Sequence, residues 1–105
     1  MRRIAAGDVR KIVFACEAGA GSSLMGANSL KKKIKKAKLE IEVVHAPVNR
    51  LPSDTDVIVT HQGLSKRASS ASETAPVISF KMFLNDPAID RLVSDLIAGN
   101  DVTSP

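Results

Sequence analysis

The chain is 105 residues long and 44% hydrophobic, which is typical of one domain that buries a core of its own. Its net charge is +4, but aromatic residues make up only 3% and include neither Trp nor Tyr, which argues against a nucleic-acid partner that stacks its bases. No segment reaches the ~20 apolar residues of a membrane helix, so we expect no insertion into a membrane. One cysteine and two histidines exclude an internal disulfide and argue against a metal site, and a lone thiol is typical of the cytoplasm.

The first part of the chain predicts a strand followed by a helix. Met1–Val9 has no clear pattern, so we expect a flexible leader or linker. Lys11–Ala15 is a short, apolar, β-prone run, which predicts a strand that stops at Cys16. A glycine-rich turn follows, and a helix is then expected from the serine pair at 22–23, either of which can cap it, to about Lys36. The buried face of this helix is expected to contain Leu24, Ala27, Leu30 and Ile34.

The middle of the chain continues the alternation of strands and helices. Leu39–His45 predicts a second strand, at an edge of the sheet because polar and apolar residues alternate in its first half. Two prolines then bracket a connection in which we expect one helical turn at Val48–Leu51. The next segments predict, in order, a buried strand at Asp56–Thr60, a short helix at Gln62–Ser70 with Leu64 and Ala68 inward, and a strand at Pro76–Ser79.

The last predicted helix has clear signals at both ends. Asn85 or Asp86 can cap its start, and Pro87 suits its first position. Gly99 is expected to end the helix, and residues 100–105 are expected to form a flexible tail. The buried face of this helix is expected to contain Ile89, Leu92, Val93, Leu96 and Ile97.

Strand–helix alternation predicts a single three-layer α/β domain over residues 10–99, with a four-stranded parallel sheet between helices. Right-handed crossovers favour the strand order 2-1-3-4 of flavodoxin-like, Rossmann-like folds. In such sheets ligands bind beyond the carboxyl ends of the strands, at the switch point between strands 1 and 3. Because Cys16 follows the first predicted strand and His61 follows the third, we expect both at one crevice.

The segment after Cys16 has the composition of an anion-binding loop. Glycines between a strand and a helix start let backbone N–H groups point inward, and the helix start adds unpaired donors and partial positive charge. The same donors favour a thiolate and suit the three oxygens of a phosphoryl group on its sulfur. We therefore expect Cys16 to carry a phosphoryl group, although a buried, inert cysteine is the alternative. The expected phosphate-binding loop is Glu17, Ala18, Gly19, Ala20, Gly21, Ser22 and Ser23.

Several side chains near the cysteine leave alternatives open. A carboxylate at Glu17 opposes both a thiolate and a phosphate, so it either faces solvent or keeps the phosphocysteine reactive. His61 either caps and packs at the end of its strand, or acts as an auxiliary donor to the phosphoryl group or as a partner contact. Arg50 and Arg67 are expected at the surface, within reach of a partner or of the phosphate.

The segment from Cys16 to Ala27 resembles the active-site segment of the mannitol-type enzyme IIB domain of the bacterial phosphoenolpyruvate-dependent sugar phosphotransferase system (PTS). The resemblance covers about residues 10–98 and includes the Asn-Arg-Leu-Pro segment at 49–52 and the Val-Thr-His segment at 59–61. It implies a phosphotransferase without a cofactor, in which a phosphohistidine on a IIA domain phosphorylates Cys16. The phosphocysteine then passes the group to mannitol as the membrane-embedded IIC domain imports it. It also implies a cytoplasmic domain, tethered to the membrane where it is fused to IIC.

Other functions are compatible with this fold class. Low-molecular-weight phosphatases share the fold and the cysteine loop, but they use Cys-x5-Arg, and here Ser22 occupies the arginine position. Without that arginine, hydrolysis should be slow and a phosphocysteine should persist, as a carrier requires. A phosphorylation-sensing IIB-like domain of a regulator would use the same chemistry as a transport domain, and the residues do not distinguish these two hypotheses. An FMN-binding flavodoxin is disfavoured because Trp and Tyr are absent.

Overall fold

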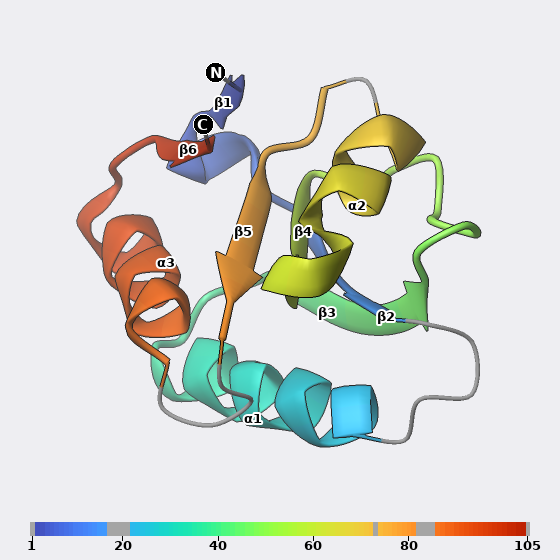
Figure 1. Cartoon of the computed structure of the whole chain (residues 1–105). Helices are drawn as coiled ribbons and strands as arrows, with labels where there is room; N and C mark the ends of the chain where they lie inside the picture. Colours follow the sequence, from blue (N-terminus) through green and yellow to red (C-terminus); the bar gives the residue numbers. More distant parts are fainter. Residues whose placement is uncertain (1, 17–21, 73, 82–85, 105) are drawn as a thin grey trace.

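The computed structural model of the chain describes residues 2–16, 22–72, 74–81 and 86–104 (Figure 1). Two short 3₁₀ turns, Ala6–Asp8 and Gln62–Leu64, accompany the helices and strands. The elements in chain order are β1 (Arg2–Ile4), β2 (Lys11–Cys16), α1 (Ser22–Lys36), β3 (Glu42–Pro47), β4 (Val57–His61), α2 (Ser65–Ala71), β5 (Val77–Phe80), α3 (Pro87–Ala98) and β6 (Val102–Ser104).

Four of the strands form a parallel sheet in the order β3-β2-β4-β5. Because β2 is the first strand of this sheet along the chain, the order corresponds to the predicted 2-1-3-4, and that prediction is confirmed. The central strands β2 and β4 are buried almost throughout, as expected for parallel strands that are covered on both faces. Their register places Ala15 beside Thr60, so both strands end at the same edge of the sheet.

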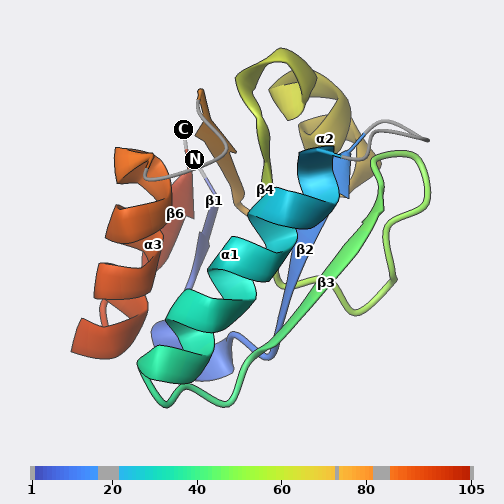
Figure 2. The ribbon, with the colours of Figure 1, turned by 90° about the horizontal axis from the view of Figure 1, so that it is seen from below.

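Helices cover both faces of the sheet, which gives the predicted three layers (Figure 2). The face that carries Ile12 and Phe14 packs against α1 and α3, and it holds the larger core cluster. The opposite face carries Ala15 and Ile58 and packs against Ala68 of α2. This division follows from the alternation of side chains along a strand, which sends successive residues to opposite faces.

The helix α3 begins and ends at the residues that its capping signals indicate. The carboxylate of Asp86 accepts hydrogen bonds from the N–H groups of Ala88 and Lys81, both at 2.9 Å. Gly99 follows the helix with a φ of 77°, in the left-handed region that glycine adopts readily. Ile89, Leu92 and Leu96 are buried as predicted, but Ile97 is 61% exposed. The prediction for Ile97 is wrong, because this residue lies at the last turn and at the margin of the buried face.

The second strand of the sheet lies further along the chain than the sequence pattern indicates. The predicted range was Leu39–His45, whereas β3 spans Glu42–Pro47. The shift arises where α1 ends: Lys38 adopts a φ of 60°, and the N–H of Leu39 bonds the carbonyl of Ile34 at 3.2 Å. These bonds belong to the helix end, so Leu39 packs on the core before the strand begins. The edge position predicted for this strand is confirmed.

The connection after β3 also differs from the prediction of a helical turn at Val48–Leu51. It forms a hydrogen-bonded turn instead, in which the N–H of Arg50 donates to the carbonyl of Pro47 at 2.9 Å. Val48 is buried in the smaller core cluster beneath α2. Leu51 also packs against this cluster, so the side chains of Val48 and Leu51 hold the connection against the sheet without a helix.

The two ends of the chain pair with each other, although we expected a flexible leader and a flexible tail. Strands β1 and β6 form an antiparallel pair in which Arg2 lies opposite Ser104 (Figure 1). The guanidinium group of Arg2 also donates hydrogen bonds to the carbonyls of Ala75 and Ser69, at 3.0 and 2.9 Å. Segments of three residues carry too little periodicity to be recognised in a sequence, so this difference reflects long-range pairing.

Candidate active site

Cys16 is the last residue of β2, so it lies at the carboxyl edge of the sheet. The residue is only 6% exposed, and its thiol donates a hydrogen bond to the carbonyl of Ala46, with Sγ and O 3.6 Å apart. Its own carbonyl accepts a hydrogen bond of 2.7 Å from the N–H of Val48. Both contacts come from β3 and the residue that follows it, so the end of this edge strand fixes the position of the sulfur.

Most of the predicted phosphate-binding loop, residues 17–21, lies outside the described residues, and so do the side chains of Ser22 and Ser23. The backbone of Ser22 begins α1, a helix of 15 residues with no acidic side chain in its first turn. The start of this helix therefore follows the cysteine after five residues, and its unpaired N–H groups carry partial positive charge. The strand and the helix that the sequence predicts on either side of this segment are both present in the structure.

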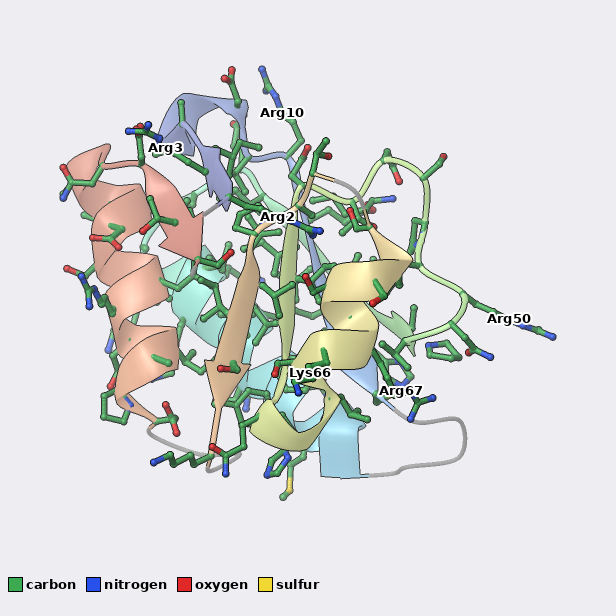
Figure 3. All side chains as sticks on the ribbon, turned by 45° about the horizontal axis from the view of Figure 1, so that its top comes forward. Arg2, Arg3, Arg10, Arg50, Lys66 and Arg67 are labelled. Carbon is green, nitrogen blue, oxygen red and sulfur yellow. The ribbon has the colours of Figure 1, made fainter. Side chains whose placement is uncertain are left out.

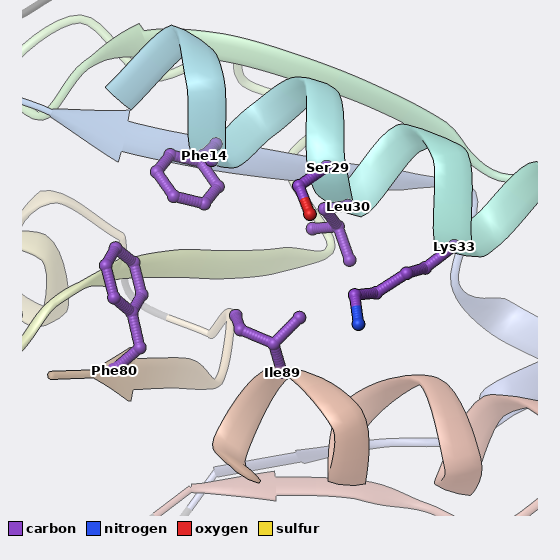
Figure 4. A pocket seen from close by; sticks show the side chains of 7 residues that line it. Phe14, Ser29, Leu30, Lys33, Phe80 and Ile89 are labelled. Atoms are coloured by element: carbon purple, nitrogen blue, oxygen red, sulfur yellow. The ribbon is translucent and has the colours of Figure 1, made fainter. Parts of the chain in front are cut away.

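A glycine in α1 determines how closely this helix approaches the strand that ends in Cys16. A Cβ atom added to Gly26 would lie 2.5 Å from Cζ of Phe14, closer than carbon atoms can approach without displacement. Beside this contact is a cavity of about 10 Å³, enough for one water molecule, lined by residues of α1, β5 and α3 as well as Phe14 (Figure 4). Nothing in the helical pattern of the sequence assigned this role to Gly26. A glycine inside a helical pattern, where it costs about 1 kcal/mol, was the signal that could have revealed it.

His61 ends β4, beside the end of β2, as the predicted topology requires. Its Nδ1 atom accepts a hydrogen bond from the N–H of Gly63 at 3.1 Å, which caps the turn at Gln62–Leu64. Its ring contacts Phe80 edge to face, with ring centroids 5.9 Å apart. The capping and packing role is therefore present in the structure. Because Nδ1 accepts, the proton of the neutral ring lies on Nε2, which can act as a donor.

The end of the sheet that carries Cys16 and His61 is held together by neighbouring contacts. The hydroxyl of Thr60 donates to the carbonyl of Ala15 at 3.0 Å and thereby ties β4 to β2 one residue before the site. Side chains alternate along each strand, and Ala15 pairs with Thr60, so Cys16 and His61 project from the sheet face that α1 and α3 cover. The two predicted site residues are thus brought to one edge and one face.

Exposed basic side chains flank this edge of the sheet. Arg50 lies on the connection after β3, and Lys66 and Arg67 lie at the start of α2, away from Arg3 and Arg10 near the β1–β6 pair (Figure 3). Lys81 follows β5 and is also exposed. Asp86 lies near this edge too, but it is buried and bonded to backbone N–H groups. The described surface of the edge is therefore favourable for an approaching anion.

Within the part of the chain that the structure describes, no three His, Cys, Asp or Glu residues come together as a metal site. No described helix is long and apolar enough to cross a membrane. At this edge of the sheet the described residues supply the thiol of Cys16, the imidazole of His61, the start of α1 and exposed cations.

Comparison with known proteins gives a family for this arrangement. The family described as "PTS system, Lactose/Cellobiose specific IIB subunit" matches residues 11–95. The chain belongs to this PTS IIB family.

Similar relatives of this IIB chain are named as mannitol-specific components. It is 49% identical over 88 residues to the mannitol-specific EIICB component of Bacillus subtilis, a match that covers 84% of this chain and 18% of the relative. The EIICB component of Geobacillus stearothermophilus is 50% identical over 88 residues, which are 84% of this chain and 19% of the relative. The EIICBA component of Pasteurella multocida is 47% identical over 88 residues, 84% of this chain and 14% of the relative. The resemblance to mannitol-type IIB domains is thus confirmed, and the chain spans less than a fifth of these relatives' length.

Proposed function

We propose that this chain is a cytoplasmic phosphocarrier domain in which Sγ of Cys16 accepts a phosphoryl group from a phosphohistidine of a IIA domain. It then donates the group to mannitol during uptake through a IIC domain. The position of Cys16 carries the proposal, because the residue ends a central strand at the switch point of the sheet, just before the start of α1. The relatives named EIICB and EIICBA support a partnership with IIC and IIA domains.

The transfer requires two in-line displacements at phosphorus. In the first, the thiolate of Cys16 attacks, an S–P bond forms and the P–N bond to the donor histidine breaks, and that imidazole takes the electron pair and then a proton. In the second, a hydroxyl group of mannitol attacks and releases its proton to solvent, an O–P bond forms, the P–S bond breaks and the thiolate is regenerated. The start of α1 and the backbone N–H groups before it would hold the phosphoryl oxygens in both steps.

The position of the sulfur sets a condition for the first displacement. Sγ of Cys16 faces the carbonyl of Ala46 and is largely covered, so it must turn outward to reach a phosphorus atom on another protein. A rotation about its Cα–Cβ bond is the movement we propose, because the residue ends β2 at the edge of the sheet. The basic side chains around this edge would favour the approach of a phosphorylated, negatively charged partner.

A phosphatase is the competing reaction for a cysteine in this fold. Such enzymes need a guanidinium group six residues after the cysteine, and in this chain that residue is Ser22, the first residue of α1. Arg50 and Arg67 flank this edge of the sheet, but they come from other segments of the chain and are exposed. Slow hydrolysis and a persistent phosphocysteine are therefore expected.

Mannitol phosphorylation by reconstituted components tests this function. Membranes with a IIC domain that lacks its own IIB would be supplied with phosphoenolpyruvate, enzyme I, HPr, a mannitol-type IIA domain and this chain. We expect mannitol phosphate to form with the natural chain and not with Cys16→Ala. Formation of product with Cys16→Ala would overturn the proposal. Cys16-dependent hydrolysis of p-nitrophenyl phosphate at an enzymatic rate would instead establish a phosphatase.

A further inference from the structure

The second half of α1 carries several lysines, and among the described residues only one of them belongs to an ion pair. The helix contains no Asp or Glu, yet it has lysines at five positions from 31 to 36, and Lys38 follows it. Lys33 is half-buried and pairs with Asp90 at 2.9 Å. The other five lysines are exposed, and none of them belongs to an ion pair among the described residues. We call this set the lysine face: Lys31, Lys32, Lys35, Lys36 and Lys38.

The lysine face carries more positive charge than a solvent-exposed helix surface needs for stability. Its five positive charges exceed the net charge of the whole chain, which is +4. Lys31 and Lys35, like Lys32 and Lys36, are four residues apart and repel each other by about 0.2–0.5 kcal/mol per pair. An anionic surface placed against this half of the helix would relieve that repulsion.

An apolar surface lies next to the lysine face, where α3 runs beside α1 (Figure 2). The two helices border a shallow groove of about 560 Å³, whose lining includes Lys36 and Ala37 of α1 and Val93 and Ile97 of α3. The ion pair of Lys33 and Asp90 also lines it. Ile97 is 61% exposed and is one of two large hydrophobic side chains described as exposed. Lysines beside an exposed aliphatic residue are the combination that binds at the interface of a lipid bilayer.

We propose that the lysine face and Ile97 dock on the anionic headgroup surface of a phospholipid membrane. Lysine is a compact, hydrated charge on a flexible stem, which suits mobile lipid headgroups better than the fixed carboxylates of a protein partner. Each lysine near such a surface strengthens binding by about 1 kcal/mol, or about fivefold. Binding of this strength is weak for a free domain and becomes effective when a IIC domain holds the chain near the membrane.

This proposal rests on the proposed function, because membrane docking would position Cys16 to deliver its phosphoryl group to a sugar. The lysine face lies toward the end of α1, between about 14 and 21 Å along the helix from its start at 1.5 Å per residue, so docking would leave Cys16 uncovered. With α1 lying along the bilayer, the edge that carries Cys16 would stay within about one helix diameter, ~10–12 Å, of the headgroups. Arg50 and Arg67 come from the connection after β3 and from α2, which covers the opposite face of the sheet, so a IIA domain could still approach them.

Binding to vesicles at low salt tests the proposal on the chain alone. We expect sedimentation with vesicles of phosphatidylcholine and phosphatidylglycerol, but not with phosphatidylcholine alone, and a loss of binding as salt rises. The triple variant Lys32→Gln, Lys35→Gln, Lys36→Gln should bind about a hundredfold more weakly. Ile97→Ser should weaken binding several-fold with an unchanged dependence on salt. The matched control is Arg91→Gln, a charge loss at an exposed position of α3 outside this groove, and it should bind normally.

Two outcomes would overturn the proposal. One is equal binding of the natural chain and the triple variant to anionic vesicles, or no binding by either. The other is a triple variant that is phosphorylated more slowly by a IIA domain in solution without membranes, which would assign the lysine face to an acidic protein. Failure of the proposed function is seen separately, as the absence of Cys16 phosphorylation in that same solution assay. A Cys16→Ser variant should bind vesicles as the natural chain does.

Discussion

At the scale of single residues, Gly26 shows how the lack of a side chain lets a helix pack close to the strand that carries Cys16. The ring of Phe14 occupies the space where a Cβ would be, and Phe14 lies two residues before Cys16 on the same strand. Phe14 also contacts the ring of Phe80, with ring centroids 5.2 Å apart, so displacement of the Phe14 ring would disturb this contact as well. The start of α1, which would hold the phosphoryl oxygens, is therefore placed by a contact one turn further along the helix.

Gly26→Ala should destabilise the chain even though alanine is the better helix former. Overpacking against Phe14 costs about 1–3 kcal/mol and the gain in helix propensity is about 1 kcal/mol, which leaves a net loss of up to about 2 kcal/mol. Chemical denaturation measures it. The matched control is Gly7→Ala, whose new Cβ meets no atom within 4 Å and should change stability by less than about 0.5 kcal/mol. Equal stability of both variants would mean that the contact does not position α1.

His61 provides a second prediction at this scale, because its ring nitrogen caps the turn that follows β4. His61→Ala should lower the free energy of unfolding by about 1 kcal/mol, and His61→Asn should recover most of it, since an asparagine oxygen can accept the same hydrogen bond from Gly63. Thermal or urea unfolding of the two variants checks this. Equal losses in both would show that packing on Phe80, and not the cap, accounts for the stability.

At the scale of elements, the signals that predicted correctly are those that depend on local sequence. The caps of α3 at Asp86 and Gly99 and the buried strands β2 and β4 agree with the sequence because each pattern is complete within a few residues. The start of β3 was placed too early because residues up to Leu39 are hydrogen-bonded into the end of α1, and apolar alternation does not report that bonding. The edge occupied by Cys16 and His61 followed from topology alone. By contrast, the contact of Gly26 with Phe14 and that of His61 with Phe80 join residues that are distant in sequence, and no local sequence pattern indicates them.

The beginnings of β2 and β3 are joined by a charge cluster with a predictable response to pH. Nζ of Lys11 lies 3.1 Å from Glu42 and 3.0 Å from Asp54. The hydrogen bond from Lys11 lowers the pKa of Asp54 below its ordinary value of 3.8, and the bonds to Asp54 and Glu42 raise the pKa of Lys11 above 10.5. The stabilisation is therefore complete between these two ordinary values, and it is lost as pH falls through the lowered pKa of Asp54 or rises through the raised pKa of Lys11.

Lys11→Met should accordingly be less stable than the natural chain at pH 7, and the difference should shrink as the pH is lowered below 3.8. Urea denaturation at a series of pH values measures it. Lys66→Met, at an exposed lysine of α2, is the control and should show no such dependence on pH. A difference for Lys11→Met that stays constant down to the acid limit would show that the cluster does not contribute through charge.

At the scale of the whole molecule, the pairing of the two chain ends is the feature that sequence patterns did not predict. The strands β1 and β6 bury Val102 and Ser104 although each has only three residues. Arg2 connects this pair to the rest of the fold by its hydrogen bonds to two carbonyls, one of them in α2. Such pairing arises from tertiary contacts, and it brings both ends of the chain to one place on the surface (Figure 1).

Replacing Arg2 and Arg3 separately tests this tertiary contact. Arg2→Gln should destabilise the chain by about 1–3 kcal/mol, because it removes two charge-assisted hydrogen bonds to carbonyls at a partly buried position. Arg3→Gln removes only an exposed ion pair with Asp101 at 3.6 Å and should change stability by no more than about 0.5 kcal/mol. Thermal unfolding checks both, and equal effects would contradict the role given to Arg2.

The central claim is that Cys16 carries the phosphoryl group, and mass spectrometry after incubation with a phosphorylated IIA domain tests it most directly. We predict a gain of one phosphoryl group that maps to the peptide containing Cys16, that is absent from Cys16→Ala, and that is lost when IIC membranes and mannitol are added. A phosphoryl group that maps to another residue, or an unmodified chain beside a fully phosphorylated donor, would contradict the account.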